Sequence, residues 1–149
     1  MLVVRIQERT PVAILAGVES SAVDGEGVVL PIRLQEAPVD LPVLFQSEGV
    51  ANGQLGAARD RLATEVLGRI QELAPDLFSK IDACSAVRDG VRLHVVGIPQ
   101  EILVGPVGVG SLERRINAVR SLMETHRLGV EREIDLRFLG QAVVRDRER

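Results

Sequence analysis

The hydrophobic and polar positions alternate most clearly near the end of the chain. Apolar residues at 134, 136 and 138 alternate with charged residues at 133, 135 and 137, which is the period of two of a half-buried strand. A second short strand is predicted over residues 141–145, after Gly140. The segment from Glu131 to Arg149 therefore indicates a β-hairpin.

The turn of this hairpin fixes its register. A three-residue loop, Phe138-Leu139-Gly140 with Gly140 left-handed, suits these residues better than a tight two-residue turn. It places Glu133 opposite Arg145, Ile134 opposite Val144, and Leu136 opposite Ala142. If no further strand pairs with residues 141–145, the last strand offers unpaired backbone groups to another chain.

The rest of the chain predicts strands and two amphipathic helices. The strands are expected at 2–6, 12–15, 28–30, 41–45 (an edge or packing strand, because of Pro42), 81–87, 91–95 and 102–104. Turns are expected at Asp24–Gly27 and Arg88–Gly90, and Pro99 is expected to break the chain.

The first helix is expected to open at Asn52-Gly53, run to about Ala74 and end at Pro75. Its apolar stripe consists of Leu55, Leu62, Val66, Ile70 and Leu73. The second helix is expected from an N-cap at Ser111 to about His126, closed by Leu128-Gly129, with a stripe of Leu112, Ile116, Val119 and Met123. The order of elements predicts an α+β fold, an antiparallel sheet of hairpins with two helices packed on one face.

Composition and charge exclude several classes of function. Aromatic residues make up 2% of the 149 residues, so a stacking platform for single-stranded nucleic acid is not expected. A net charge of −3 argues against a protein that binds a phosphate backbone. Cys84 is the single cysteine, so neither an intramolecular disulfide nor a cysteine metal cluster is expected. The sequence contains neither an apolar run of membrane-spanning length nor the pattern of a signal peptide.

No set of residues has the spacing of a catalytic, cofactor or metal site. The loop Gly105–Gly110 lies between a strand and a helix, but it matches neither phosphate-binding glycine pattern. His94 and His126 have no Ser or Cys at a recognisable spacing, and Cys84 is expected to be a small core residue. The scattered acids are expected on solvated faces: Asp60, Glu65, Glu72, Asp76, Asp82, Asp89 and Glu124.

Four segments, in order, resemble the extracytoplasmic region of the bacterial cell-division family FtsQ/DivIB. Residues 3–13 (VVRIQERTPVA) resemble its V-x-E-R-x-P-V-A strand, and residues 23–29 (VDGEGVV) its V-D-x-x-G-V strand. Residues 41–44 (LPVL) resemble its L-P-x-L segment. Residues 134–138 with 141–145 (IDLRF and QAVVR) resemble its I-D-L-R-F/Y and V-V-R ending.

The resemblance implies a domain organisation and a location. Residues 1–38 would be the last two strands of a POTRA-like domain plus a linker, and residues 39–149 a β-domain. The family's cytoplasmic tail, membrane span and first half of the POTRA domain have no counterpart in this sequence. The chain would act on the extracytoplasmic, periplasmic face of the cytoplasmic membrane, at the division septum.

The resemblance also implies partners and a binding site. The chain would be a non-enzymatic divisome scaffold without a cofactor, recruiting FtsB/DivIC-like and FtsL-like proteins by strand addition at its last strand. The residues that match the family's partner-binding positions are Arg137, Phe138, Gly140, Gln141, Ala142, Val143 and Val144. Arg137 would pair with an acid of the partner, and Phe138 would contact it.

Two other functions are compatible with the sequence. One is a POTRA-type module of outer-membrane protein transport or assembly, which would also bind partners by strand addition. The other is a small nucleotide-binding enzyme that uses the loop Gly105–Gly110.

Overall fold

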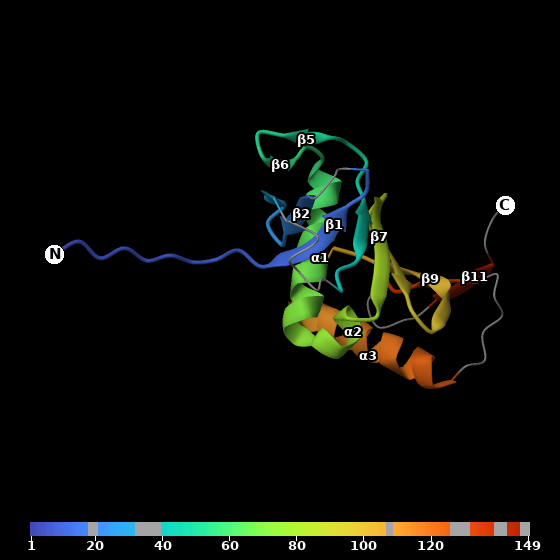
Figure 1. The fold of residues 1–149 in the computed structure, drawn as a ribbon. Coiled ribbons are helices and arrows are strands. Elements are labelled where there is room, and N and C mark those ends of the chain that lie inside the picture. The colour runs from blue at the N-terminus through green and yellow to red at the C-terminus, as the bar shows by residue number, and fades with distance from the viewer. Residues whose placement is uncertain (18–20, 32–39, 107–108, 126–131, 139–142, 147–149) are drawn as a thin grey trace.

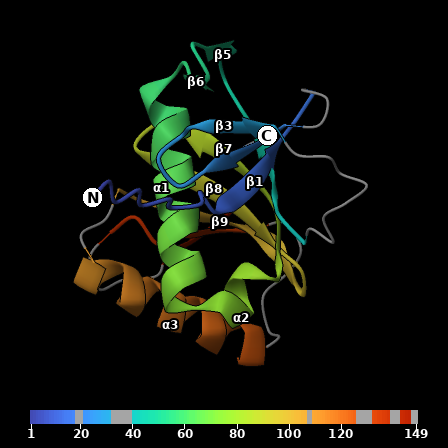
Figure 2. The same ribbon diagram turned by 60° about the vertical axis from the view of Figure 1, so that its left-hand side comes forward.

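The fold is a mixed β-sheet with helices on one face, as the computed structural model shows (Figures 1 and 2). The structure describes residues 1–17, 21–31, 40–106, 109–125, 132–138 and 143–146. The strands are β1 Pro11–Leu15, β2 Ser21–Asp24, β3 Val29–Pro31, β4 Val43–Phe45, β5 Val50–Ala51, β6 Gln54–Leu55, β7 Ile81–Val87, β8 Gly90–Val95, β9 Ile98–Val104, β10 Arg132–Asp135 and β11 Val143–Asp146. The helices are α1 Ala58–Leu73, α2 Pro75–Phe78 and α3 Val109–Thr125. The predicted α+β class is confirmed.

The main sheet has nine strands in the order β11-β10-β9-β8-β7-β4-β1-β2-β3. The predicted hairpins β7–β8 and β10–β11 are antiparallel, but β4 runs parallel to both β1 and β7, and β10 runs parallel to β9. The expectation of an entirely antiparallel sheet was therefore wrong. The β4–β7 and β9–β10 pairs are parallel because the connections that contain α1 and α3, respectively, carry the chain back to the starting end of the sheet.

The helices cover one face of the sheet and form the core with it. Figure 2 shows α1 running in front of the strands, with α3 crossing near its lower end. From α1, Val66, Leu67 and Ile70 are buried, and the predicted α3 stripe buries Leu112, Ile116 and Val119. The sheet contributes buried aliphatic residues to the same cluster, among them Leu44, Cys84, Val91, Leu93, Ile102, Val104 and Ile134.

Near the middle of the chain, one predicted feature was wrong and one open alternative was decided. Asn52 and Gly53 do not open a helix; both have positive φ angles, +52° and +72°, and they form the turn between β5 and β6. An Asn-Gly pair favours that hairpin turn, and α1 begins at Ala58. Residues 41–45 were expected to form an edge or a packing strand, and the structure shows the packing alternative, because β4 lies between β1 and β7 and buries Leu44. Pro42 is tolerated because it precedes the strand, and its carbonyl accepts the Ile14 N–H at 2.9 Å.

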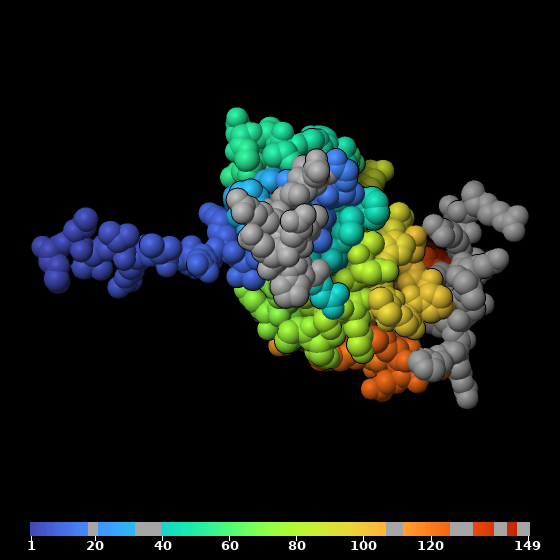
Figure 3. Space-filling view, viewed as in Figure 1, coloured from blue at the N-terminus to red at the C-terminus, as the bar shows by residue number. Residues whose placement is uncertain are grey.

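Three predicted boundaries also changed. Residues 2–6 are exposed and form no strand; they extend away from the folded body (Figure 3), because the β1–β2 pairing starts only at Pro11 opposite Asp24. Pro99 does not break the chain, since it lies in β9 beyond the part that pairs with β10, where a missing N–H is tolerated. Helix α3 begins at Val109, so Ser111 is in its first turn and is not the N-cap. The predicted end at His126 and the closing residues 128–129 lie outside the described residues.

The turn between β2 and β3 requires glycine at position 27. Gly27 has a φ of +81°, and a Cβ there would lie 2.8 Å from Cγ of Arg61. Arg61 cannot move away cheaply, because its guanidinium donates to the carbonyls of Leu55 and Gly56 at 2.8 and 3.1 Å.

We expect Gly27→Ala to destabilise the fold by about 2–3 kcal/mol, through left-handed strain and the clash with Arg61 together. Gly17→Ala is the matched control, because Gly17 has a φ of +70° with open space around its Cα. Gly17→Ala should lower the free energy of unfolding by the left-handed strain alone, about 1 kcal/mol. Urea unfolding of both variants measures the difference, and equal losses would show that Arg61 does not constrain the turn.

Candidate functional site at the last hairpin

Strand β11 lies at one edge of the sheet. It pairs with β10 in the predicted register, Glu133 opposite Arg145 and Ile134 opposite Val144, so this prediction is confirmed. Among the described strands, β10 is the one neighbour of β11. An edge strand presents a row of N–H and C=O groups on its other side.

The structure brings four of the seven predicted site residues together at this edge. Phe138, which is 49% exposed, follows β10, and Val143 and Val144 begin β11. Arg137 lies one residue before Phe138, and its side chain is 24% exposed. Gly140, Gln141 and Ala142 lie outside the described residues, as do the predicted left-handed turn and the Leu136–Ala142 pair. We call Phe138 and Val143–Arg145 the docking edge.

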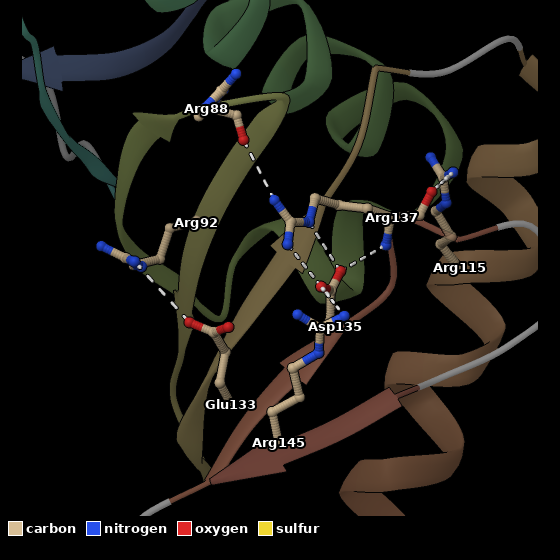
Figure 4. A network of polar contacts seen from close by, with 7 residues as sticks. All are labelled: Arg88, Arg92, Arg115, Glu133, Asp135, Arg137 and Arg145. Atoms are coloured by element: carbon tan, nitrogen blue, oxygen red, sulfur yellow. Dashed lines mark hydrogen bonds and ion pairs between the residues drawn. The ribbon is translucent and has the colours of Figure 1, made fainter. Parts of the chain in front are cut away.

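A buried carboxylate organises the base of the hairpin (Figure 4). Asp135 has no exposed surface and accepts three hydrogen bonds from Arg137: from the backbone N–H at 3.0 Å, Nε at 2.9 Å and Nη2 at 2.7 Å. The Arg137 guanidinium also donates to the Arg88 carbonyl at 3.2 Å. The hydrogen bond from Arg137 lowers the pKa of Asp135 despite its burial, and the same bond raises the pKa of Arg137.

A second cation approaches Asp135 from β11. Nη2 of Arg145 lies 3.8 Å from Oδ2 of Asp135, and the Arg145 side chain is 49% exposed. The Arg145 guanidinium also lies over the ring of Phe138, 5.7 Å from its centroid, within range of a cation–π contact. Arg145 thus connects the buried carboxylate to the exposed aromatic residue.

Three residues of this site were not singled out from the sequence. For Arg145, the predicted register indicated only a pair with Glu133. For Asp135, strand alternation predicted a position on a solvated face, so nothing indicated a role in the site. Arg115 is buried on α3 and donates to the carbonyls of Gly105 at 3.3 Å and Arg137 at 3.1 Å. Nothing in the sequence connects residue 115 to carbonyls at 105 and 137.

The other candidate sites have structural roles where the structure describes them. His94 is exposed on β8, with Nε2 3.7 Å from Oε1 of Glu101. Gly105 accommodates Arg137, since a Cβ on Gly105 would lie 3.4 Å from the Arg137 Cα. Residues 107–108 of the proposed phosphate loop and His126 are outside the described residues.

Within the described residues, no group of three or more His, Cys, Asp or Glu side chains is arranged to hold a metal ion. Across the same ranges, none of the helices has the length and apolar character needed to cross a membrane.

Of the acids expected on solvated faces, one is buried and the others are exposed. Asp60 was expected to be solvated, but it is fully buried. It accepts hydrogen bonds from the backbone N–H of Ser47 at 2.8 Å and of Glu48 at 3.3 Å, and from the Ser47 hydroxyl at 3.0 Å. Those N–H groups follow the end of β4, so the contact is tertiary and no local pattern around residue 60 indicates it. The remaining predicted surface acids are exposed: Glu65, Glu72, Asp76, Asp82, Asp89 and Glu124.

Cys84 is a buried core residue, as predicted. Burial, and secondarily the negative charge of Asp60, raises the pKa of its thiol to about 12. Because the thiolate is the reactive form, we expect no measurable alkylation by iodoacetamide at pH 8 in the native protein and complete alkylation in guanidinium chloride. Mass spectrometry of intact protein measures both; rapid labelling of the native protein would contradict this prediction.

Two of the segments that resemble the family meet in space. Arg9 contacts the carboxylates of both Asp24 and Glu26. Asp24 is buried, and its Oδ1 also accepts the N–H groups of Glu26 at 3.0 Å and Val28 at 2.9 Å. The first two motifs thus include residues that hold the start of β1 against the β2–β3 turn.

Comparison with known proteins identifies the family. Residues 13–137 match the family model described as "Cell division protein FtsQ/DivIB, C-terminal". The match covers most of the chain and includes Asp135 and Arg137; it ends at residue 137, before Phe138 and β11. No curated protein matches the chain. FtsQ/DivIB proteins are non-enzymatic scaffolds, which favours the cell-division prediction over transport and nucleotide binding. The chain belongs to the FtsQ/DivIB family of cell-division proteins, and its function is in cell division.

Proposed function

We propose that this chain is a divisome scaffold that recruits FtsB/DivIC-like and FtsL-like proteins by adding a partner strand to β11. The observation that carries the proposal is the position of β11 at the edge of the sheet, beside an exposed Phe138. An extended segment of another protein would continue the ladder through backbone hydrogen bonds, and side-chain contacts would provide specificity.

The side chains of the docking edge favour a partner strand of mixed character. Opposed residues of an antiparallel pair share a face, so Val144 lies on the helix-covered face with Ile134, and Val143 and Arg145 lie on the other face. Val144 remains 37% exposed, which supports an apolar partner residue beside it. On the other face, Arg145 supports an acidic partner residue.

The contacts of Arg137 within the protein change the role expected of it. Its guanidinium already donates to both oxygens of Asp135 and to the Arg88 carbonyl. A partner acid would have to compete with a buried carboxylate for that guanidinium. We therefore assign the contact with a partner acid to Arg145, the more exposed of the two side chains.

Residues 140–142, which lie outside the described residues, are included in the proposed site on the resemblance of their sequence to the family. Residues 1–38 are proposed as the end of a POTRA-like domain and residues 39–149 as the β-domain; the parallel β1–β4 pair joins them in one sheet. The proposed location is the extracytoplasmic face of the cytoplasmic membrane at the septum, in agreement with the family.

A titration followed by NMR tests the proposal. We expect the soluble extracytoplasmic part of an FtsB/DivIC-like protein from the same genome to shift the amide signals of Phe138 and Val143–Arg145. The same partner should slow hydrogen exchange at β11. The amides of β3, at the opposite edge of the sheet, are the internal control. Changes at β3 without changes at β11 would refute docking at β11.

A further inference from the structure

We propose that Asp135 and Arg115 are positioning residues for partner binding: together they fix the conformation of the docking edge from inside the protein. This inference rests on the proposed function, because it concerns the same edge. Neither residue is expected to touch the partner, since both side chains are buried.

Asp135 fixes the point at which β10 stops. Its Oδ1 accepts the backbone N–H of Arg137, two residues further along, which turns the chain immediately after the strand. The Arg137 side chain folds back onto the same carboxylate. Phe138 therefore leaves the hairpin in a direction set by Asp135.

Close packing holds the Arg137 side chain in this position. A Cβ on Gly90, at the start of β8, would lie 3.2 Å from Cδ of Arg137, so a side chain there would crowd the arginine. A Cβ on Gly105, just after β9, would be in ordinary van der Waals contact with its Cγ at 3.5 Å. The Arg137 side chain is thus held by packing near its backbone and by the hydrogen bond from its guanidinium to the Arg88 carbonyl.

Arg115 fixes the same turn from the helix side. Its guanidinium donates to the carbonyl of Arg137 and to the carbonyl of Gly105, so α3 holds the end of β9 and the residue before Phe138 together. Burial lowers the pKa of Arg115. A buried cation bonded to two carbonyls is costly, and a gain in conformational specificity is a physical reason to retain it.

The contacts form one continuous path. Figure 4 shows its course from Arg115 on α3 to the backbone of Arg137 and through Asp135 to Arg145. From Arg145 the path continues to the ring of Phe138. Arg145 and Phe138, at the end of this path, are its exposed residues. Loss of the Asp135 charge would weaken its contact with Arg145 and its hydrogen bonds to Arg137, which form the turn. The β7–β8–β9 ladder should remain intact, because it has its own hydrogen bonds.

The test compares Asp135→Asn and Arg115→Lys with wild type, using the soluble part of an FtsB/DivIC-like protein as the probe. We expect Asp135→Asn to weaken binding about tenfold in calorimetric titration and to accelerate hydrogen exchange of the Val143 and Arg145 amides, which face β10. Exchange in β8 should remain unchanged. Arg115→Lys keeps a donor for one carbonyl, so it should lose less affinity for the probe than Arg115→Met. Asp82→Asn, at an exposed acid on β7, is the matched control and should bind as wild type.

The outcomes separate this inference from the proposed function. If wild type does not bind the probe, or if Val144→Pro binds as well as wild type, docking at β11 fails. If Val144→Pro loses binding but Asp135→Asn and Arg115→Met bind as wild type with unchanged exchange at β11, the positioning role is overturned. If Asp135→Asn does not fold, the two Arg115 variants decide. Equal acceleration of exchange in β8 and β11 would indicate a general structural role and would also overturn the inference.

Discussion

Val144→Pro should weaken binding of an FtsB/DivIC-like partner at least about 30-fold while the protein stays folded. The Leu136 N–H donates to the Leu103 carbonyl of β9. Alternation therefore directs the N–H of Asp135 toward Val143 and the N–H of Val144 away from β10. Proline at position 144 removes that outward donor, and one unmade hydrogen bond with its unsatisfied partner costs roughly 2 kcal/mol. The fold should survive because β11 is an edge strand, whereas the core lies under β4 and β7–β10. Calorimetric titration gives the affinity, and thermal unfolding confirms that the variant is folded.

Two further variants make this result specific. Val144→Thr keeps the N–H and the β-branched shape, so it should bind within about threefold of wild type. Amides alternate in direction along a strand, so Val143→Pro and Val144→Pro remove donors on opposite sides of β11. Val143→Pro removes the donor that faces Asp135 on β10 and should loosen the β10–β11 hairpin in hydrogen exchange, whereas Val144→Pro should affect docking alone. Wild-type affinity in Val144→Pro would exclude strand addition.

Asp60→Ala should lower the free energy of unfolding by about 2–4 kcal/mol, a large loss for a single polar side chain. The substitution leaves the backbone N–H groups of Ser47 and Glu48 without their carboxylate acceptor. It also separates α1 from the segment that follows β4. For a domain of this size the melting temperature should fall by about 5–15 °C.

The control for this substitution lies on the same helix. Glu65→Ala removes an exposed carboxylate from α1, so its effect should stay within about 0.5 kcal/mol. Asp60→Asn keeps one acceptor oxygen and should lie between the two. Differential scanning calorimetry ranks the three variants, and equal melting temperatures for Asp60→Ala and Glu65→Ala would show that the Ser47 contact contributes nothing.

Local sequence signals predicted the elements whose residues determine their own conformation. The strand Ile81–Val87 has the bounds that its apolar run indicates, and the turn at Arg88–Gly90 follows it. In the last hairpin, alternation and the position of Gly140 were sufficient for the register of β10 and β11. These signals succeed because neighbouring residues supply both the turn geometry and the facing side chains.

The errors arose where a distant segment decided the outcome. Alternation alone placed a strand at residues 2–6, but a strand requires a neighbour, and the pairing with β2 starts at Pro11. Pro42 left an edge and a packing position open for residues 41–45, and only the connections of the chain placed β4 between two parallel neighbours. The Asn52-Gly53 turn is different: its positive φ angles follow a local rule, so the sequence could have predicted it.

By itself, the sequence determined the α+β class, the last hairpin with its register, and the four segments that resemble the FtsQ/DivIB family. Only the tertiary structure placed that hairpin at the edge of a mixed sheet and buried Asp135 beneath it. It also brought Arg115 to the carbonyl of Arg137, and it made Arg145 the more exposed cation. The physical reason is that alternation reports which side of a strand a residue occupies, whereas burial and ion pairing depend on the strands and helices that pack against it.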